Sequence, residues 1–210
     1  MIPVKVLAVR YLDNASPALA GELGAKNGSR CLGMLTTDCD DATYIALDAA
    51  TKAAEVQVIY GRSFYAGAGN ATTPNAGEVI GILAGRTPGA VRSGMEAALG
   101  ALNSLGFEET DGVPYLARTV SSVGSFLAGE AGVQPGSALA YLIAPPLEGM
   151  YALDAALKAA DVKLCKLYAP PSETNFGGAL LSGSQSACDT ARDAFARAVA
   201  EVARRPKVQE

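Results

Sequence analysis

The chain contains one pattern of apolar and polar positions twice. Residues 47–56 read Leu-Asp-Ala-Ala-Thr-Lys-Ala-Ala-Glu-Val, and residues 153–162 read Leu-Asp-Ala-Ala-Leu-Lys-Ala-Ala-Asp-Val. Alanine, leucine and lysine are strong helix formers, and the apolar residues of both copies recur at helical spacing. From residues 56 and 162 onward the apolar period changes to two, which is typical of a strand. Each copy therefore predicts a helix that leads directly into a strand.

The polar positions of the two predicted helices also match. Opposite the apolar stripe, each helix has an acid, a lysine and a second acid, at Asp48, Lys52 and Glu55 in the first copy and at Asp154, Lys158 and Asp161 in the second. An acid four residues before a lysine is the favourable order for an ion pair on a helix surface. We expect this row to lie in solvent in both copies.

The duplication extends beyond the two helices. Residues 19–24 resemble residues 127–132, and residues 32–35 resemble residues 139–142. Self-similarity at a fixed period indicates repeated structural units, and each half has the size of a domain. The sequence predicts two related domains, 1–107 and 108–210.

Further elements follow from the same periodicities and from helix-capping and turn residues. We expect helices over 16–23, from about 43, over 88–105, 125–132 and 184–203, and strands over 2–11, 31–37, 78–85, 115–123 and 138–144. Predicted helices and strands therefore occur in both halves of the chain.

Composition excludes several functions. The net charge is −4 and lysines and arginines do not cluster, which argues against a nucleic-acid partner. No apolar run approaches the ~20 residues that a membrane helix needs. The N-terminus lacks the layout of a signal peptide, so we expect a cytoplasmic location and no membrane association.

Histidine is absent from the chain. Its absence removes the nucleophile systems that depend on histidine and most zinc sites. The four cysteines, Cys31, Cys39, Cys165 and Cys188, form no CxxC pair, and we interpret them as reduced structural thiols. We expect no catalytic residues, no metal and no cofactor. An enzyme that uses only carboxylates is the alternative.

The most unusual polar cluster is Asp38-Cys39-Asp40-Asp41, directly before a predicted helix. Carboxylates favour helix N-termini, which accounts for one or two of these acids. Three acids repel one another unless a cation or hydrogen-bond donors lie nearby. The cluster is therefore a candidate binding site for a cation. The glycine-rich segment 61–74 is either an ordinary connector or a mobile flap.

Five segments carry a resemblance to a known family: 40–44, 60–67, 76–79, 144–148 and 171–176. Together with the duplicated helix they resemble the tandem-domain class of bacterial microcompartment shell proteins, and within it the ethanolamine-utilisation group. The resemblance implies the α/β (α+β) fold class, with two circularly permuted shell domains in tandem, each an antiparallel-rich sheet flanked by helices. It also implies a homotrimer that imitates a hexamer and tiles with other shell proteins. Lys52 and Lys158 would lie at the tile edge.

The resemblance further implies two openings through the trimer. Small acidic pores would bind ethanolamine through Asp40, Asp41, Glu78, Phe107, Glu148, Thr174, Asn175 and Phe176. A central pore would be gated by Tyr65, Ala66, Gly67, Ala68, Gly69 and Asn70. Two alternatives are a shell protein of an ethanol- or choline-consuming compartment and a small-molecule sensor trimer. Hexagonal sheets in electron micrographs would favour the shell protein over the sensor.

Overall fold

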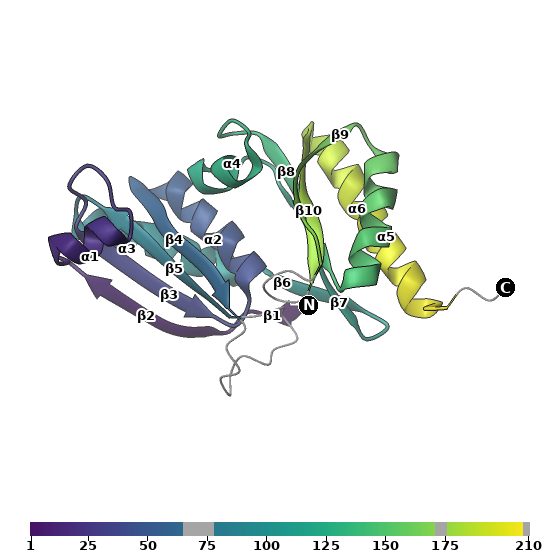
Figure 1. Cartoon of the computed structure of the whole chain (residues 1–210), viewed down its shortest axis with the longest axis horizontal. Coiled ribbons are helices and arrows are strands. Elements are labelled where there is room, and N and C mark those ends of the chain that lie inside the picture. The colour runs from purple at the N-terminus through teal and green to yellow at the C-terminus, as the bar shows by residue number, and fades with distance from the viewer. Residues whose placement is uncertain (65–77, 171–175, 208–210) are drawn as a thin grey trace. The chain divides into compact units, whose positions relative to one another are not determined.

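The computed structural model describes residues 1–64, 78–170 and 176–207, and the chain divides into two compact units. The N-terminal unit comprises Pro3–Gly106 and Gly124–Leu127. The C-terminal unit comprises Met1–Ile2, Phe107–Val123 and Ala128–Glu210. Each unit contains an antiparallel sheet with helices, which confirms the α/β class (Figure 1). A domain boundary between residues 107 and 108 stays a prediction.

The N-terminal unit is built on a four-stranded antiparallel sheet. In spatial order its strands are β2 (Val6–Leu12), β3 (Cys31–Thr37), β5 (Glu78–Gly85) and β4 (Val56–Phe64). Helices α2 (Asp40–Ala53) and α3 (Pro88–Leu102) cover one face of this sheet (Figure 1). The short helix α1 (Pro17–Glu22) contributes Ala20 to a core cluster with Leu32 and Ile82.

Two strand glycines let α2 and α3 approach the sheet closely. A Cβ atom added at Gly33 would lie 2.8 Å from Val91 Cγ1, and one added at Gly81 would lie 2.6 Å from Leu47 Cδ1. Both distances are shorter than carbon atoms tolerate, so these positions need glycine for packing rather than for backbone conformation.

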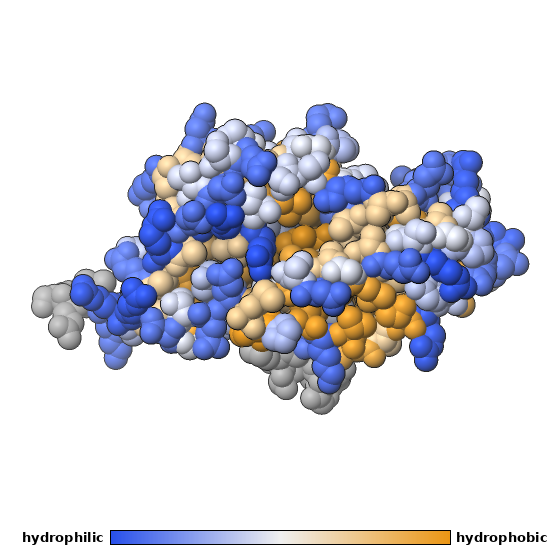
Figure 2. All heavy atoms as spheres, turned by 180° about the vertical axis from the view of Figure 1, so that it is seen from behind, coloured by the Kyte–Doolittle hydropathy of each residue, from blue (hydrophilic) through white to orange (hydrophobic). Residues whose placement is uncertain are grey.

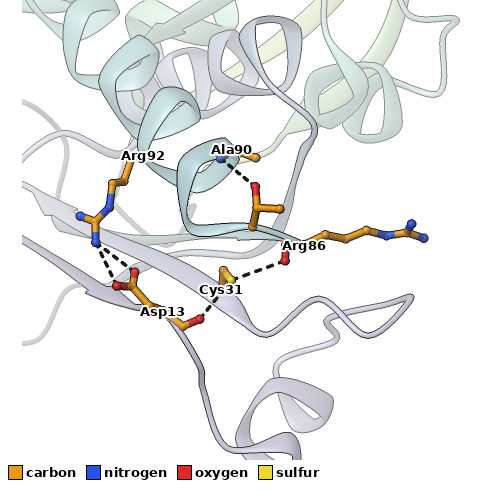
Figure 3. A network of polar contacts seen from close by, with 6 residues as sticks. Asp13, Cys31, Arg86, Ala90 and Arg92 are labelled. Carbon is orange, nitrogen blue, oxygen red and sulfur yellow. Dashed lines mark hydrogen bonds and ion pairs between the residues drawn. The ribbon is translucent and has the colours of Figure 1, made fainter.

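Polar contacts fix α3 on this sheet (Figure 3). Arg92 Nη2 donates to both carboxylate oxygens of Asp13, at 3.0 and 3.1 Å, and its guanidinium lies 4.6 Å from the ring centroid of Tyr11. The thiol of Cys31 donates to the carbonyl oxygen of Asp13 at 3.1 Å and contacts that of Arg86 at 3.7 Å. Cys31 therefore contacts both Asp13, which follows β2, and Arg86, which follows β5. Asp13 also binds Arg92 in the first turns of α3.

The C-terminal unit is built on a six-stranded sheet. In spatial order the strands are β1 (Ile2–Pro3), β6 (Gly106–Thr110), β7 (Val113–Val120), β8 (Ala138–Ala144), β10 (Gly177–Gly183) and β9 (Val162–Tyr168). Helices α5 (Pro146–Ala159) and α6 (Gln185–Arg204) lie side by side on the sheet (Figure 1). Their apolar faces and the inward side of β8 and β10 form one core, which includes Leu142, Ala156, Leu181 and Phe195. Helix α4 (Ser125–Ala131) begins in the short segment assigned to the N-terminal unit.

Most predicted elements are confirmed, and the bounds of β3, β5 and β8 match the prediction. The strand expected over 2–11 is instead two strands, because Ile2–Pro3 pairs with β6 whereas β2 starts at Val6 and pairs with β3. Helix α2 starts at Asp40 rather than near Thr43, so the acids expected before the helix lie in its first turn.

The hairpin of β6 and β7 was missed by the sequence analysis. Its signal is the pair Asp111-Gly112, whose φ angles are 49° and 81°. Positive φ at both central residues is the requirement of the type I′ turn, which favours Asp-Gly. In the described part of the chain, no helix has the length and apolar character needed to cross a membrane.

Candidate functional site

Buried carboxylates gather at one end of the four-stranded sheet. Asp40 and Asp41 occupy the first turn of α2 and are buried, as is Glu78 at the start of β5. Strand β4 ends where β5 begins, with Phe64 paired to Glu78, and β3 ends opposite Val79. Since α2 follows β3 after two residues, the register places Asp40, Asp41 and Glu78 at the same end of the sheet.

Burial sets the electrostatics of this carboxylate cluster. Removal of Asp40 from water, and next the charge of Asp41, raise the pKa of Asp40 well above its ordinary value. Hydrogen bonds from the backbone N–H of Asp41, at 2.9 Å, and from the Ser63 side chain act in the opposite direction. Oxygen Oε1 of Glu78 is buried and has no hydrogen-bond partner among the described residues. A cationic donor would therefore relieve both the repulsion and the unsatisfied oxygen.

The predicted aromatic residues meet in the C-terminal unit. The rings of Phe107 on β6 and Phe176, directly before β10, have centroids 5.7 Å apart and are tilted by 54°. Gly177 pairs with Ala144, which places Phe176 at the end of the sheet where α5 begins. Glu148 lies in the first turn of α5 and is partly buried. The C-terminal unit thus contributes two aromatic rings and one acid to the set of predicted site residues.

The predicted site residues are therefore of three kinds. Three carboxylates lie together in the N-terminal unit, whereas Phe107, Glu148 and Phe176 lie in the C-terminal unit. Thr174 and Asn175 lie outside the described residues, as does the whole predicted gate, residues 65–70. That the groups form one ethanolamine site stays a prediction. Ser63 was missed by the sequence analysis, because a serine within an alternating strand carries no signal of its partner.

The acid-lysine-acid rows differ from the prediction at Asp48. Its side chain is 0% exposed, and its carboxylate accepts the backbone N–H of Gly124 at 2.7 Å and that of Leu127 at 2.9 Å. The prediction that Asp48 lies in solvent is wrong, because the carboxylate satisfies the first backbone donors of the α4 segment. In the second copy Asp154 and Lys158 are exposed and paired at 2.6 Å, as expected. Lys52 is partly exposed, 3.7 Å from Asp48.

The cysteines are free thiols, and Cys31, Cys39 and Cys188 are buried. Burial, and next the charges of Asp40 and Asp41, raise the pKa of Cys39 well above its ordinary value. Across the described residues, no group of three or more cysteines, aspartates or glutamates is arranged to hold a metal ion.

Comparison with known proteins first shows the class of protein to which the chain belongs. The profile described as BMC domain matches residues 31–112, which contain β3, α2, β4, β5 and α3 of the N-terminal unit. The class is that of bacterial microcompartment shell proteins, in agreement with the antiparallel sheets and flanking helices of both units.

The particular family follows from relatives that match along nearly the whole chain. The bacterial microcompartment shell protein EutL of Clostridium perfringens is 59% identical over 210 residues, 98% of this chain and 97% of that protein. A crystal structure of EutL from the same species has a TM-score of 0.91 and covers 98% of this chain and 95% of that one. The ethanolamine utilization protein EutL from Leptotrichia buccalis is 55% identical, with a TM-score of 0.93 and coverage of 99% and 98%. The chain belongs to the EutL family of bacterial microcompartment shell proteins.

Family membership confirms the resemblance found in the sequence. The protein is a component of a microcompartment shell, and it assembles there with other shell proteins. The family is one of structural shell proteins rather than enzymes.

Proposed function

We propose that this protein forms homotrimers in the shell of an ethanolamine-utilisation microcompartment and binds ethanolamine in small acidic pores. One observation carries the ligand proposal. Asp40, Asp41 and Glu78 are buried at one sheet end, and one oxygen of Glu78 has no hydrogen-bond partner among the residues that the structure describes. The whole-length identity to shell proteins named for ethanolamine utilisation supports the choice of ligand.

The chemistry of the predicted residues suits a small ammonium alcohol. The three carboxylates stabilise the ammonium group, and an aromatic face such as that of Phe176 adds a cation–π attraction. Thr174 and Asn175 supply polar groups for the hydroxyl of the ligand. A ligand of about four heavy atoms gains at most ~1.5 kcal/mol per atom, so binding is expected to be modest.

The proposed assembly follows from the duplicated chain. Two related domains, 1–107 and 108–210, in each of three copies give a closed ring of six similar units. Exposed large hydrophobic side chains support burial in an assembly, among them Leu147, Leu164 and Leu167 of the C-terminal unit. Hydrophobic residues also lie among the hydrophilic ones on the face shown in Figure 2. Segment 65–70 would gate the central opening, and ethanolamine would shift the gate towards closure if it binds the closed form more tightly.

Isothermal calorimetry tests the ligand site. Ethanolamine should bind the unmodified trimer and should bind Glu78→Gln at least tenfold more weakly, because the amide has no charge for the ammonium group. The exposed control Asp161→Asn should bind as the unmodified protein does. Undiminished binding to Glu78→Gln would remove Glu78 from the site. Tighter binding of choline than of ethanolamine would instead assign the shell to a choline-consuming compartment.

A further inference from the structure

The N-terminal unit contains a docking contact between α2 and the segment Gly124–Leu127. Asp48 accepts two backbone N–H groups of this segment, as described above. Thr51 Oγ1 accepts a third, from Ser125 at 3.1 Å, and the rings of Tyr44 and Phe126 lie 6.0 Å apart. Leu127 is 1% exposed. The side of α2 that carries Asp48 and Thr51 thus holds the start of α4 by hydrogen bonds to its backbone and by side-chain packing.

The internal repeat contains a second copy of the helix and a second copy of the docking segment. In this second copy, the matching residues of the helix and of the segment are exposed. Asp154 of α5 matches Asp48, and residues 16–19, which are the N-cap and the first three residues of α1, match residues 124–127. The Asp154 side chain is 63% exposed, whereas that of Asp48 is fully buried. Leu19 is 46% exposed, whereas its counterpart Leu127 is buried. In the described part of the chain no side chain caps α1.

The residues around the second pair differ in a coordinated way. Leu157 stands at the position of Thr51, and Pro17 stands at the position of Ser125. Proline has no N–H, so an acceptor opposite it would have no donor, and an apolar side chain fits there better. Where Tyr44 contacts Phe126, the second copy has Met150 and Ala18. Each change on the helix is accompanied by a matching change on the docking segment.

We propose that residues 16–19 of one copy dock on the exposed face of α5 of a neighbouring copy, around Asp154. The Asp154 carboxylate accepts backbone N–H groups at Ser16 and Leu19, and Leu19 becomes buried. This inference rests on the proposed trimer: three contacts within chains and three between chains alternate around the ring. A Cβ added at Gly124 would lie 2.7 Å from the Asp48 carbonyl oxygen, so Ser16 must dock slightly further from its helix than Gly124 does.

Paired cysteines test the contact directly, in a background where the partly exposed Cys165 is replaced by serine. The variant Pro17→Cys/Leu157→Cys should form disulfides between chains and give a species of three chain masses on a non-reducing gel. The matched control is Thr51→Cys/Ser125→Cys, at two residues that are in direct contact within the chain, because the Ser125 backbone N–H donates to Thr51 Oγ1 at 3.1 Å. It should link within one chain and leave the denatured mass that of a single chain. Either cysteine of the Pro17/Leu157 pair alone should give no linked trimer.

Each outcome separates the docking contact from the trimer itself. Sedimentation of the unmodified protein as trimers, with no covalent trimer from the Pro17→Cys/Leu157→Cys variant, would overturn the contact and leave the trimer standing. Monomers of the unmodified protein would overturn both. Covalent ladders beyond three chains would contradict a closed ring. Independently, Asp154→Lys should weaken trimerisation at least tenfold, whereas Asp193→Lys, an exposed reversal on α6, should not. Equal trimerisation of both variants would also count against the contact.

Discussion

Very similar local sequences give two aspartates opposite environments. Asp48 and Asp154 both follow leucine and precede Ala-Ala, and both have a lysine four residues later. Among the described residues of the chain, backbone donors meet Asp48 but not Asp154, and Asp48 is buried whereas Asp154 is exposed. A buried carboxylate is tolerated because each accepted N–H replaces a hydrogen bond to water. The role of such a residue is therefore set by the segment that docks on it, which local sequence does not reveal.

Replacement of Asp48 by alanine should destabilise the protein by about 2–4 kcal/mol, because two buried N–H groups lose a charged acceptor. Urea unfolding followed by circular dichroism measures the change. The exposed Asp161→Ala variant should stay within about 0.5 kcal/mol of the unmodified protein. Equal stability of the Asp48→Ala variant would show that water satisfies the α4 segment.

Asp40 should make stability depend on pH. Its pKa is raised in the folded state, mainly by burial and next by Asp41, so the folded protein binds more protons than the unfolded one above the ordinary carboxyl pKa of about 4. The free energy of unfolding should therefore fall as pH rises from about 4 through the raised pKa. Asp40→Asn should flatten this decline in unfolding curves recorded across that range. An unchanged slope would assign the decline to another group.

At the scale of elements, two glycines differ in the space that is available for a side chain. A Cβ on Gly178 of β10 would lie 1.8 Å from the Leu142 carbonyl oxygen of β8, whereas a Cβ on Gly100 of α3 would meet nothing within 4 Å. Gly178→Ala should cost about 3 kcal/mol or more by disrupting the β8–β10 pairing. Gly100→Ala should stabilise by about 0.5–1 kcal/mol, because alanine loses less backbone entropy in a helix. Thermal unfolding of both variants checks the pair, and a destabilised Gly100→Ala would contradict the entropic argument.

Elements that carry a complete local signal could be predicted closely. Strand β8 is apolar throughout and ends before Pro145, and its bounds match the prediction. Lys26-Asn27-Gly28 has the residue types of a turn, and both Asn27 and Gly28 have positive φ. The Asp111-Gly112 hairpin had an equally good local signal, but the strand before it is short and starts with glycine. The residue types at the ends of a helix or strand therefore predict its boundaries when all of these local signals are considered.

The candidate site was only partly predictable, for a different reason. The acids Asp40 and Asp41 were visible as an unusual cluster, but their burial depends on β4 and β5, which are distant in sequence. The Ser63 hydrogen bond to Asp40 and the contact of Asp48 with Gly124 arise from pairings that no periodicity encodes. Residue type indicated the chemistry, whereas tertiary packing decided which atoms meet.

At the scale of the whole molecule, the lysines of the two repeats provide the test of tiling. Lys52 and Lys158 both remain at least partly exposed, as a tile-edge role requires. The double variant Lys52→Ala/Lys158→Ala should lose most extended sheets in electron micrographs while it still sediments as the unmodified trimer does. A pair of exposed lysines contributes little to folding, so thermal stability should change by less than about 1 kcal/mol. Undiminished sheets would remove both lysines from the edge.

The hydrogen bonds between Asp48 and residues 124–127 also determine where this polypeptide can be divided into two separate chains. A break after residue 107 would leave the Asp48 carboxylate on the leading fragment and its only backbone donors among the described residues on the other, so the carboxylate would lose these hydrogen bonds. A break placed after Gly132 would keep the carboxylate and its donors on one fragment. Split versions of this tandem, whether made in the laboratory or by gene fission, should therefore fold only when the leading piece extends past α4.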